Sequence, residues 1–227
     1  MNNKIFNIVF WAVALLHLLA IQQDLIWVER LTKPMIVGVL IYHYFSRTRL
    51  KSSFDKKILA GLIWSWVGDV ALMGVGIKSN FFLVGLVAFL IGHIAYITAF
   101  REDIKPGGKR PIWVISLAMA YFITHGLLFY IVLYPGLGVL KVPVAVYSLI
   151  IAFMAILAWM RSIKSSGWGY WLVAIGAWFF VISDTILAVN KFVDKLPNAG
   201  LWIMATYILA QYGIATGSIK RCSNKEN

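Results

Sequence analysis

Two aspartates interrupt stretches of the chain that are otherwise apolar. Asp69 and Asp184 both stand in the pattern small residue, Asp, two residues, Leu. An ionised Asp at the centre of a bilayer costs about 2.5–3.5 kcal/mol on insertion scales. Carboxyls retained at that cost typically have a function, and a pair of them could serve as a general acid and a charge-stabilising base.

Serine side chains accompany both aspartates. Ser65 lies four residues before Asp69, which places the two on one helix face, and Ser183 adjoins Asp184. A structural hydrogen bond to a neighbouring helix is the alternative for each Asp. The presence of two such carboxyls makes a functional pair the favoured interpretation.

Other polar residues recur on apolar segments at helical spacing. His93 and Tyr96 share one face of a segment, Tyr207 and Gln211 are four residues apart, and Lys33 stands near the start of another segment. His93 could orient a phosphate, tune a carboxyl or hydrogen-bond a helix. Gln211 cannot ionise, so it is suited to positioning substrate or water. Lys33 could contact a phosphate or extend toward lipid headgroups.

Cofactor and metal motifs are weak in this sequence. Asp69, Asp184, His93 and His125 could be imagined as ligands, but no close His–His or Cys–Cys spacing supports a metal site. The one cysteine, Cys222, excludes a disulfide framework. The sequence also lacks a glycine-rich phosphate loop and a nucleophile-elbow motif. We therefore expect neither metal nor cofactor.

The composition indicates a membrane protein that crosses the bilayer several times. The chain has 227 residues, of which 61% are hydrophobic and 13% charged, and its mean hydropathy is +0.80. A net charge of +12 would suggest nucleic acid in a soluble protein. Here the basic residues stand in short loops beside apolar segments, where they determine topology, so no nucleic-acid partner is expected.

Eight apolar segments predict an all-α fold with eight transmembrane helices in a single domain over residues 1–227. Most of the 21 basic residues fall on the side that holds the N-terminus if that side is cytoplasmic, so the positive-inside rule predicts that both termini are cytoplasmic. A multi-pass protein of the cell (inner) membrane is expected, with a polar tail at 220–227. The predicted spans are 4–23, 32–46, 57–77, 80–100, 111–134, 141–161, 168–190 and 199–219, the second opening at Lys33-Pro34.

The two halves of the sequence look related. His17 precedes Lys33 by the same number of residues as His125 precedes Lys141. This correspondence predicts a parallel repeat of four plus four helices. Helical rise places both aspartates at a similar depth, about 18 and about 20 Å from the inner ends of their spans.

The polar motifs, taken in order, resemble the YhhN family of integral-membrane lysoplasmalogenases. The resemblance runs from Lys33-Pro34 to Gln211. It rests on Ser65-x-x-Gly68-Asp69-x-x-Leu72-Met73, Gly85-x-x-x-Phe89-x-x-x-His93-x-x-Tyr96, Pro143-Val144-x-x-Tyr147, Ser183-Asp184-x-x-Leu187-Ala188 and Tyr207-x-x-Ala210-Gln211.

This resemblance implies an eight-helix hydrolase that cleaves the vinyl ether bond of lysoplasmalogens without cofactor or metal. Its products would be a fatty aldehyde and a glycerophospho-headgroup, and its partners the lysophospholipid and the bilayer. Asp184 is expected to be the acid and Asp69 the stabilising carboxylate. The residues expected to bind substrate are Lys33, Ser65, His93, Tyr96, Tyr147, Ser183, Tyr207 and Gln211.

Two other functions remain compatible with the same residues. A proton-coupled transporter of small molecules or lipids would also use buried Asp and His. A non-catalytic lipid-binding protein would tolerate Asn at both aspartates. The sequence indicates no oligomeric state.

Overall fold

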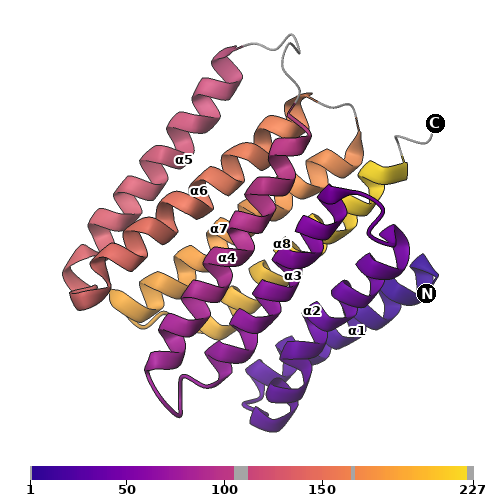
Figure 1. The fold of residues 1–227 in the computed structure, drawn as a ribbon. Helices are drawn as coiled ribbons and strands as arrows, with labels where there is room; N and C mark the ends of the chain where they lie inside the picture. Colours follow the sequence, from indigo (N-terminus) through magenta and orange to yellow (C-terminus); the bar gives the residue numbers. More distant parts are fainter. Residues whose placement is uncertain (1, 105–111, 165–166, 224–227) are drawn as a thin grey trace. The chain divides into compact units, whose positions relative to one another are not determined.

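The computed structural model describes residues 2–104, 112–164 and 167–223, and the chain divides into two compact units after Tyr96. The described residues form an all-α structure (Figure 1), which confirms the predicted class. The α-helices are α1 (Asn3–Gln22), α2 (Ile26–Thr48), α3 (Ser53–Met73), α4 (Asn80–Glu102), α5 (Ile112–Leu133), α6 (Lys141–Lys164), α7 (Trp168–Phe192) and α8 (Ala199–Ser223), and two short 3₁₀ turns, Tyr134–Gly136 and Gly138–Leu140, join α5 to α6.

The first unit, Met1–Tyr96, contains α1, α2, α3 and most of α4. Successive helices in it run in alternating directions (Figure 1). A buried hydrogen bond of 2.8 Å between His17 Nδ1 and Thr32 Oγ1 joins α1 to α2. The start of α3 carries a capping box, in which Ser52 and Asp55 satisfy each other's backbone N–H groups.

Helix α2 begins earlier than its proline predicts. Its first residue is Ile26, so Lys33 and Pro34 lie inside the helix instead of opening it. The segment from Leu25 to Val28 is apolar enough to continue the helix toward α1. Proline inside a membrane helix is tolerated where neighbouring groups compensate for the lost backbone bond.

Helices α3 and α4 approach each other closely because small residues line their contact. A Cβ added at Gly68 would lie 2.7 Å from the ring of Phe89, and one added at Gly92 would lie 3.2 Å from the carbonyl oxygen of Gly61. Small residues at a helix interface allow close backbone approach, which is the usual packing mode in membranes. The contact buries the face of α3 that carries Asp69.

The second unit, Ile97–Asn227, is built around a tight pair, α7 and α8. A Cβ added at Gly176 would lie 2.8 Å from the carbonyl oxygen of Ala210, and one added at Gly213 would lie 2.8 Å from that of Leu172. Gly213 and Gly217 form a Gly-x-x-x-Gly motif on α8. Such a motif lets two helix backbones touch, which explains the closeness of this pair.

A buried ionic cluster joins three helices of the second unit. Asp103, just after α4, accepts hydrogen bonds from Arg161 of α6 (Nε at 3.1 Å, a terminal guanidinium N at 2.6 Å) and from Arg221 of α8 (Nε at 2.8 Å). Arg161 is fully buried, and its guanidinium lies over the rings of Phe100 and Tyr170. Helix α8 ends at Ser223 and so includes the first residues of the predicted tail, 220–227. Residues 224–227 lie outside the described part of the chain.

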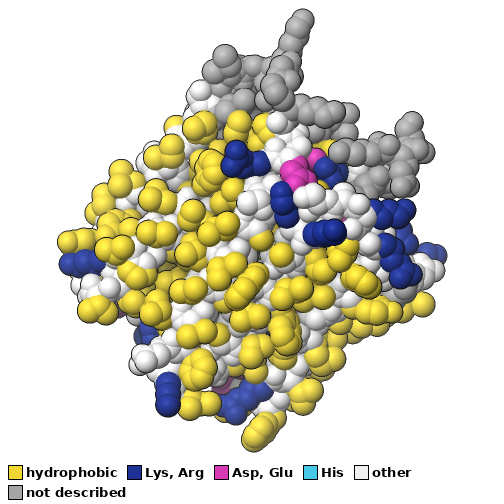
Figure 2. Space-filling view, in the orientation of Figure 1, with side chains coloured by type: hydrophobic (Ala, Val, Ile, Leu, Met, Phe, Trp, Pro, Cys, Tyr) yellow, Lys and Arg dark blue, Asp and Glu magenta, His cyan; other side chains and the backbone are white. Residues whose placement is uncertain are grey.

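Hydrophobic side chains cover most of the face seen in Figure 2, and Lys and Arg side chains gather toward the helix ends. Within the described residues, four helical segments are both long and apolar enough to cross a bilayer. They are Asn3–Gln22, Asn80–Glu102, Gly138–Ser162 and Trp168–Phe192. The remaining predicted spans, the internal repeat and the position of the termini stay predictions.

Candidate functional site

Asp69 lies on the packed face of α3 in the first unit. It is 2% exposed, and Ser65, one turn earlier, is fully buried. The ring of Tyr96 from α4 packs over Gly61, which lies one turn before Ser65 on the same helix. The structure therefore brings together three of the residues singled out from the sequence: Ser65, Asp69 and Tyr96.

His93 is fully buried in α4, one turn before Tyr96. Because no part of the His93 ring reaches the surface of the chain, it can exchange a proton with, or orient, only groups in the interior of the unit. The structure therefore assigns His93 to the interior of the first unit.

Lys33 lies in the second turn of α2 and is partly exposed. The next residue, Pro34, accepts a 2.9 Å hydrogen bond from Trp66 Nε1 of α3. Because Trp66 precedes Asp69 by less than one helical turn, this bond ties the part of α2 that bears Lys33 to the part of α3 that bears Asp69.

Asp184 lies on α7 in the second unit and accepts a hydrogen bond from the hydroxyl of Tyr147 on α6. Tyr147 is buried, whereas Asp184 is only partly buried. A phenol that donates to a carboxyl fixes its orientation and provides a route for proton transfer. Asp184 is thus both held in place and reachable.

The remaining predicted residues of the second unit have local partners. Ser183 Oγ donates a 3.0 Å hydrogen bond to the carbonyl oxygen of Ile203, which joins α7 to α8. Gln211 Nε2 donates to the hydroxyl of Tyr207 at 3.2 Å, and both side chains are buried. Ser183 thus links α7 to α8, and Tyr207 and Gln211 form a small polar pair inside the unit.

Each unit carries an aspartate beside a tyrosine from a neighbouring helix: Asp69 beside Tyr96, and Asp184 beside Tyr147. Sequence reasoning selected all four residues but did not pair them. The order of the helices could have suggested these pairs, since each tyrosine lies on the apolar helix directly before or after the helix of its aspartate. His125, compared with His17 in the predicted repeat, has a side chain outside the described residues.

Among the residues that the structure describes, no group of three His, Cys, Asp or Glu side chains is arranged to hold a metal ion. In the second unit Asp184 instead forms a carboxyl–phenol pair with Tyr147. Such pairs can hold, donate and accept protons inside apolar surroundings.

The sequence matches the profile of the YhhN family over residues 28–218. The chain belongs to the YhhN family. Similar proteins include lysoplasmalogenase TMEM86A of Homo sapiens (32% identical, covering 72% of this chain and 65% of that protein), lysoplasmalogenase TMEM86B of Sus scrofa (33%, 89% and 80%) and a lysoplasmalogenase of Mycobacterium tuberculosis (27%, 81% and 66%).

The chain spans 65% of the length of the human and bovine TMEM86A proteins that it matches. No solved structure matches it. The match begins at Val28 and ends at Ser218, so it includes all the residues that were expected to bind substrate or catalyse.

Proposed function

We propose that this protein is a membrane-embedded hydrolase that cleaves the vinyl ether bond of lysoplasmalogens. The observation that carries the proposal is family membership together with relatives named lysoplasmalogenase over most of the chain. The buried carboxyl of Asp69 and the hydrogen bond from Tyr147 to Asp184 support it, because the chemistry needs proton donors inside apolar surroundings.

The reaction is acid-catalysed addition of water. A proton is delivered to the β-carbon of the vinyl ether, and the electron pair of the double bond forms the new C–H bond. The resulting oxocarbenium ion takes up water and loses a proton to give a hemiacetal. The hemiacetal then collapses to a fatty aldehyde and the free hydroxyl of the glycerophospho-headgroup. In sum, one vinyl ether and one water give one aldehyde and one alcohol. The logic resembles that of glycosidases, which also stabilise an oxocarbenium-like transition state with carboxyls.

Asp184 acts in this proposal as the general acid, and Asp69 as the carboxylate that stabilises the cation and directs water. The partial exposure of Asp184 supports the first role, because an acid must meet substrate and regain its proton in each turnover. Tyr147 orients Asp184, and Tyr96 with Ser65 orients Asp69. Lys33, His93, Tyr207, Gln211 and Ser183 are proposed to line the path of the substrate or order water, and no metal or cofactor is involved.

The proposal includes the membrane arrangement expected from the sequence. All eight helices cross the cell (inner) membrane within one helical domain, and both termini are cytoplasmic. The substrate is a single-chain lysophospholipid, which enters from the surrounding bilayer.

Aldehyde release from lysoplasmenylethanolamine by detergent-purified protein tests this function. We expect release by the wild type and a loss of at least about 100-fold in kcat for Asp69→Asn and for Asp184→Asn, the usual contribution of a general acid. Asp194→Asn removes an exposed carboxyl in the α7–α8 connection and should leave the rate unchanged. Wild-type rates in either of the first two variants would refute the catalytic roles.

A further inference from the structure

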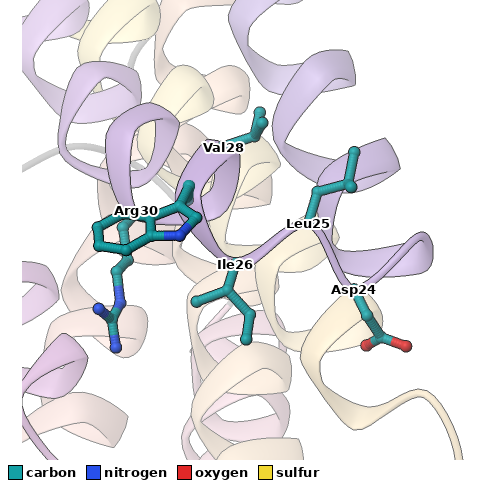
Figure 3. Close-up of a pocket in the computed structure, with 6 residues that line it drawn as sticks. Asp24, Leu25, Ile26, Val28 and Arg30 are labelled. Atoms are coloured by element: carbon teal, nitrogen blue, oxygen red, sulfur yellow. The ribbon is translucent and has the colours of Figure 1, made fainter.

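A pocket of about 490 Å³ lies where α1 turns into α2 (Figure 3). It lies wholly within the first unit. Its lining residues are Asp24, Leu25, Ile26, Trp27, Val28 and Arg30. An apolar lining with one cation and one anion is typical of a site that fixes the orientation of an amphiphilic ligand.

The charged groups of the pocket flank its apolar part. In Figure 3 the Arg30 and Asp24 side chains lie on either side of Ile26, and both charged ends point the same way. The Arg30 guanidinium lies 5.6 Å from the centre of the Trp27 ring, and this ring is 77% exposed. Asp24 adopts a left-handed backbone conformation (φ 54°), which ends the connection from α1 and presents its side chain outward.

Such a set of groups complements a zwitterion. A guanidinium binds phosphate with charge-assisted, often bidentate hydrogen bonds. A carboxylate binds an ammonium group, and the exposed indole beside the guanidinium offers an apolar surface for the methylene groups that adjoin the phosphate. A phosphate joined by two carbons to an ammonium group carries both charges on one short chain.

The pocket lies at the same end of the first unit as Asp69. Arg30 precedes Pro34 by four residues on α2, or about 6 Å of helical rise. Pro34 is bonded to Trp66 of α3, and Asp69 follows Trp66 by less than one turn. Lys33 stands on α2 between Arg30 and this bond, so two cationic residues lie along this part of the helix.

We propose that this pocket binds the headgroup of the lysophospholipid substrate, with the phosphate at Arg30 and the ammonium group at Asp24. This inference rests on the proposed function. It predicts that the enzyme prefers lysolipids with an ethanolamine- or choline-type headgroup over lysolipids whose headgroup lacks a cation. Four of the six lining residues, Asp24–Trp27, precede the region that the family profile matches, residues 28–218. In this inference the pocket recognises the substrate and takes no part in breaking the bond.

The test compares two vinyl ether lysolipids that differ only in headgroup, phosphoethanolamine and phosphoglycerol. Asp24→Asn should lower the preference for the ethanolamine substrate, measured as the ratio of the two kcat/KM values, by about tenfold, with kcat unchanged. Arg30→Gln should raise KM for both substrates by about tenfold, and Arg30→Lys should restore part of that loss.

Matched controls remove one negative and one positive charge at positions away from the pocket. Glu102→Gln and Lys51→Gln change exposed residues at the end of α4 and before α3, and both should retain the wild-type ratio and KM. Equal elution volumes and melting temperatures of all variants show that folding is preserved.

Two results separate the inference from the function on which it rests. An active wild type whose preference and KM are unchanged by Asp24→Asn and Arg30→Gln would overturn the headgroup site and leave the hydrolase intact. A folded wild type that cleaves neither lipid would overturn the proposed function, and the headgroup site with it.

Discussion

At the scale of single residues, the aspartates differ in their surroundings although their sequence motifs are alike. Asp69 is buried in the α3–α4 contact beside Ser65 and Tyr96, whereas Asp184 is partly buried and receives a hydrogen bond from Tyr147. In both cases a tyrosine from a neighbouring helix packs on the helix that carries the carboxyl. Orientation of a reactive group by a neighbouring side chain is a common requirement of precise catalysis.

The Tyr147–Asp184 contact leads to a prediction at this scale. Tyr147→Phe should lower kcat for aldehyde release by about tenfold with little change in KM, as expected for the loss of a hydrogen bond to a charged group. Tyr42→Phe removes an exposed hydroxyl from α2 and should have no effect. An unchanged kcat in Tyr147→Phe would show that Asp184 needs no orientation by the phenol.

At the scale of helices, two devices hold the elements in place. Glycines let α3 meet α4 and α7 meet α8 at backbone distance. The carboxylate of Asp103 joins the end of α4 to α6 and α8 through Arg161 and Arg221. Both guanidiniums bind the same buried carboxylate, so the cluster depends strongly on Asp103.

The cluster predicts an order of stabilities. Asp103→Asn should destabilise the protein by about 3–5 kcal/mol, because it removes the buried carboxylate that Arg161 and Arg221 share. Arg221→Met should cost less, since the pair of Arg161 and Asp103 remains. Thermal unfolding in detergent measures both, with Glu102→Gln as an exposed neighbouring control. The opposite order would show that the charge balance of the cluster does not limit stability.

At the scale of the whole molecule, the described helices match the apolar segments of the sequence closely. Residues at the ends of these helices define which loops face each side of the membrane. Lys51 and Arg101 are exposed on the predicted cytoplasmic side, and Lys78 and Lys195 are exposed on the other. The positive-inside rule predicts this assignment.

Labelling of single cysteines tests the topology. In a Cys222→Ser background, Lys78→Cys and Lys195→Cys should react with a membrane-impermeant maleimide on intact spheroplasts. Lys51→Cys and Arg101→Cys should react only after the membrane is opened. Labelling of Lys51→Cys in intact spheroplasts would reverse the proposed orientation.

The sequence by itself was sufficient to predict the all-α class, the approximate helix bounds and the residues of chemical interest. Apolar stretches between short polar joints give a strong signal, and an ionisable residue within them is conspicuous because of its cost. The start of α2 was predicted less well, because Pro34 suggested a helix start, whereas α2 begins at Ile26 and contains the proline in its interior.

Only the tertiary structure decided which of these residues meet. The hydrogen bond from Tyr147 to Asp184, the packing of Tyr96 on α3 and the joining of Asp103 to two arginines are contacts between helices. The pocket between Asp24 and Arg30 forms across a turn. Periodicity reports the face of a helix on which a residue lies. It does not report the partner of that face, which depends on the packing of side chains distant in the sequence.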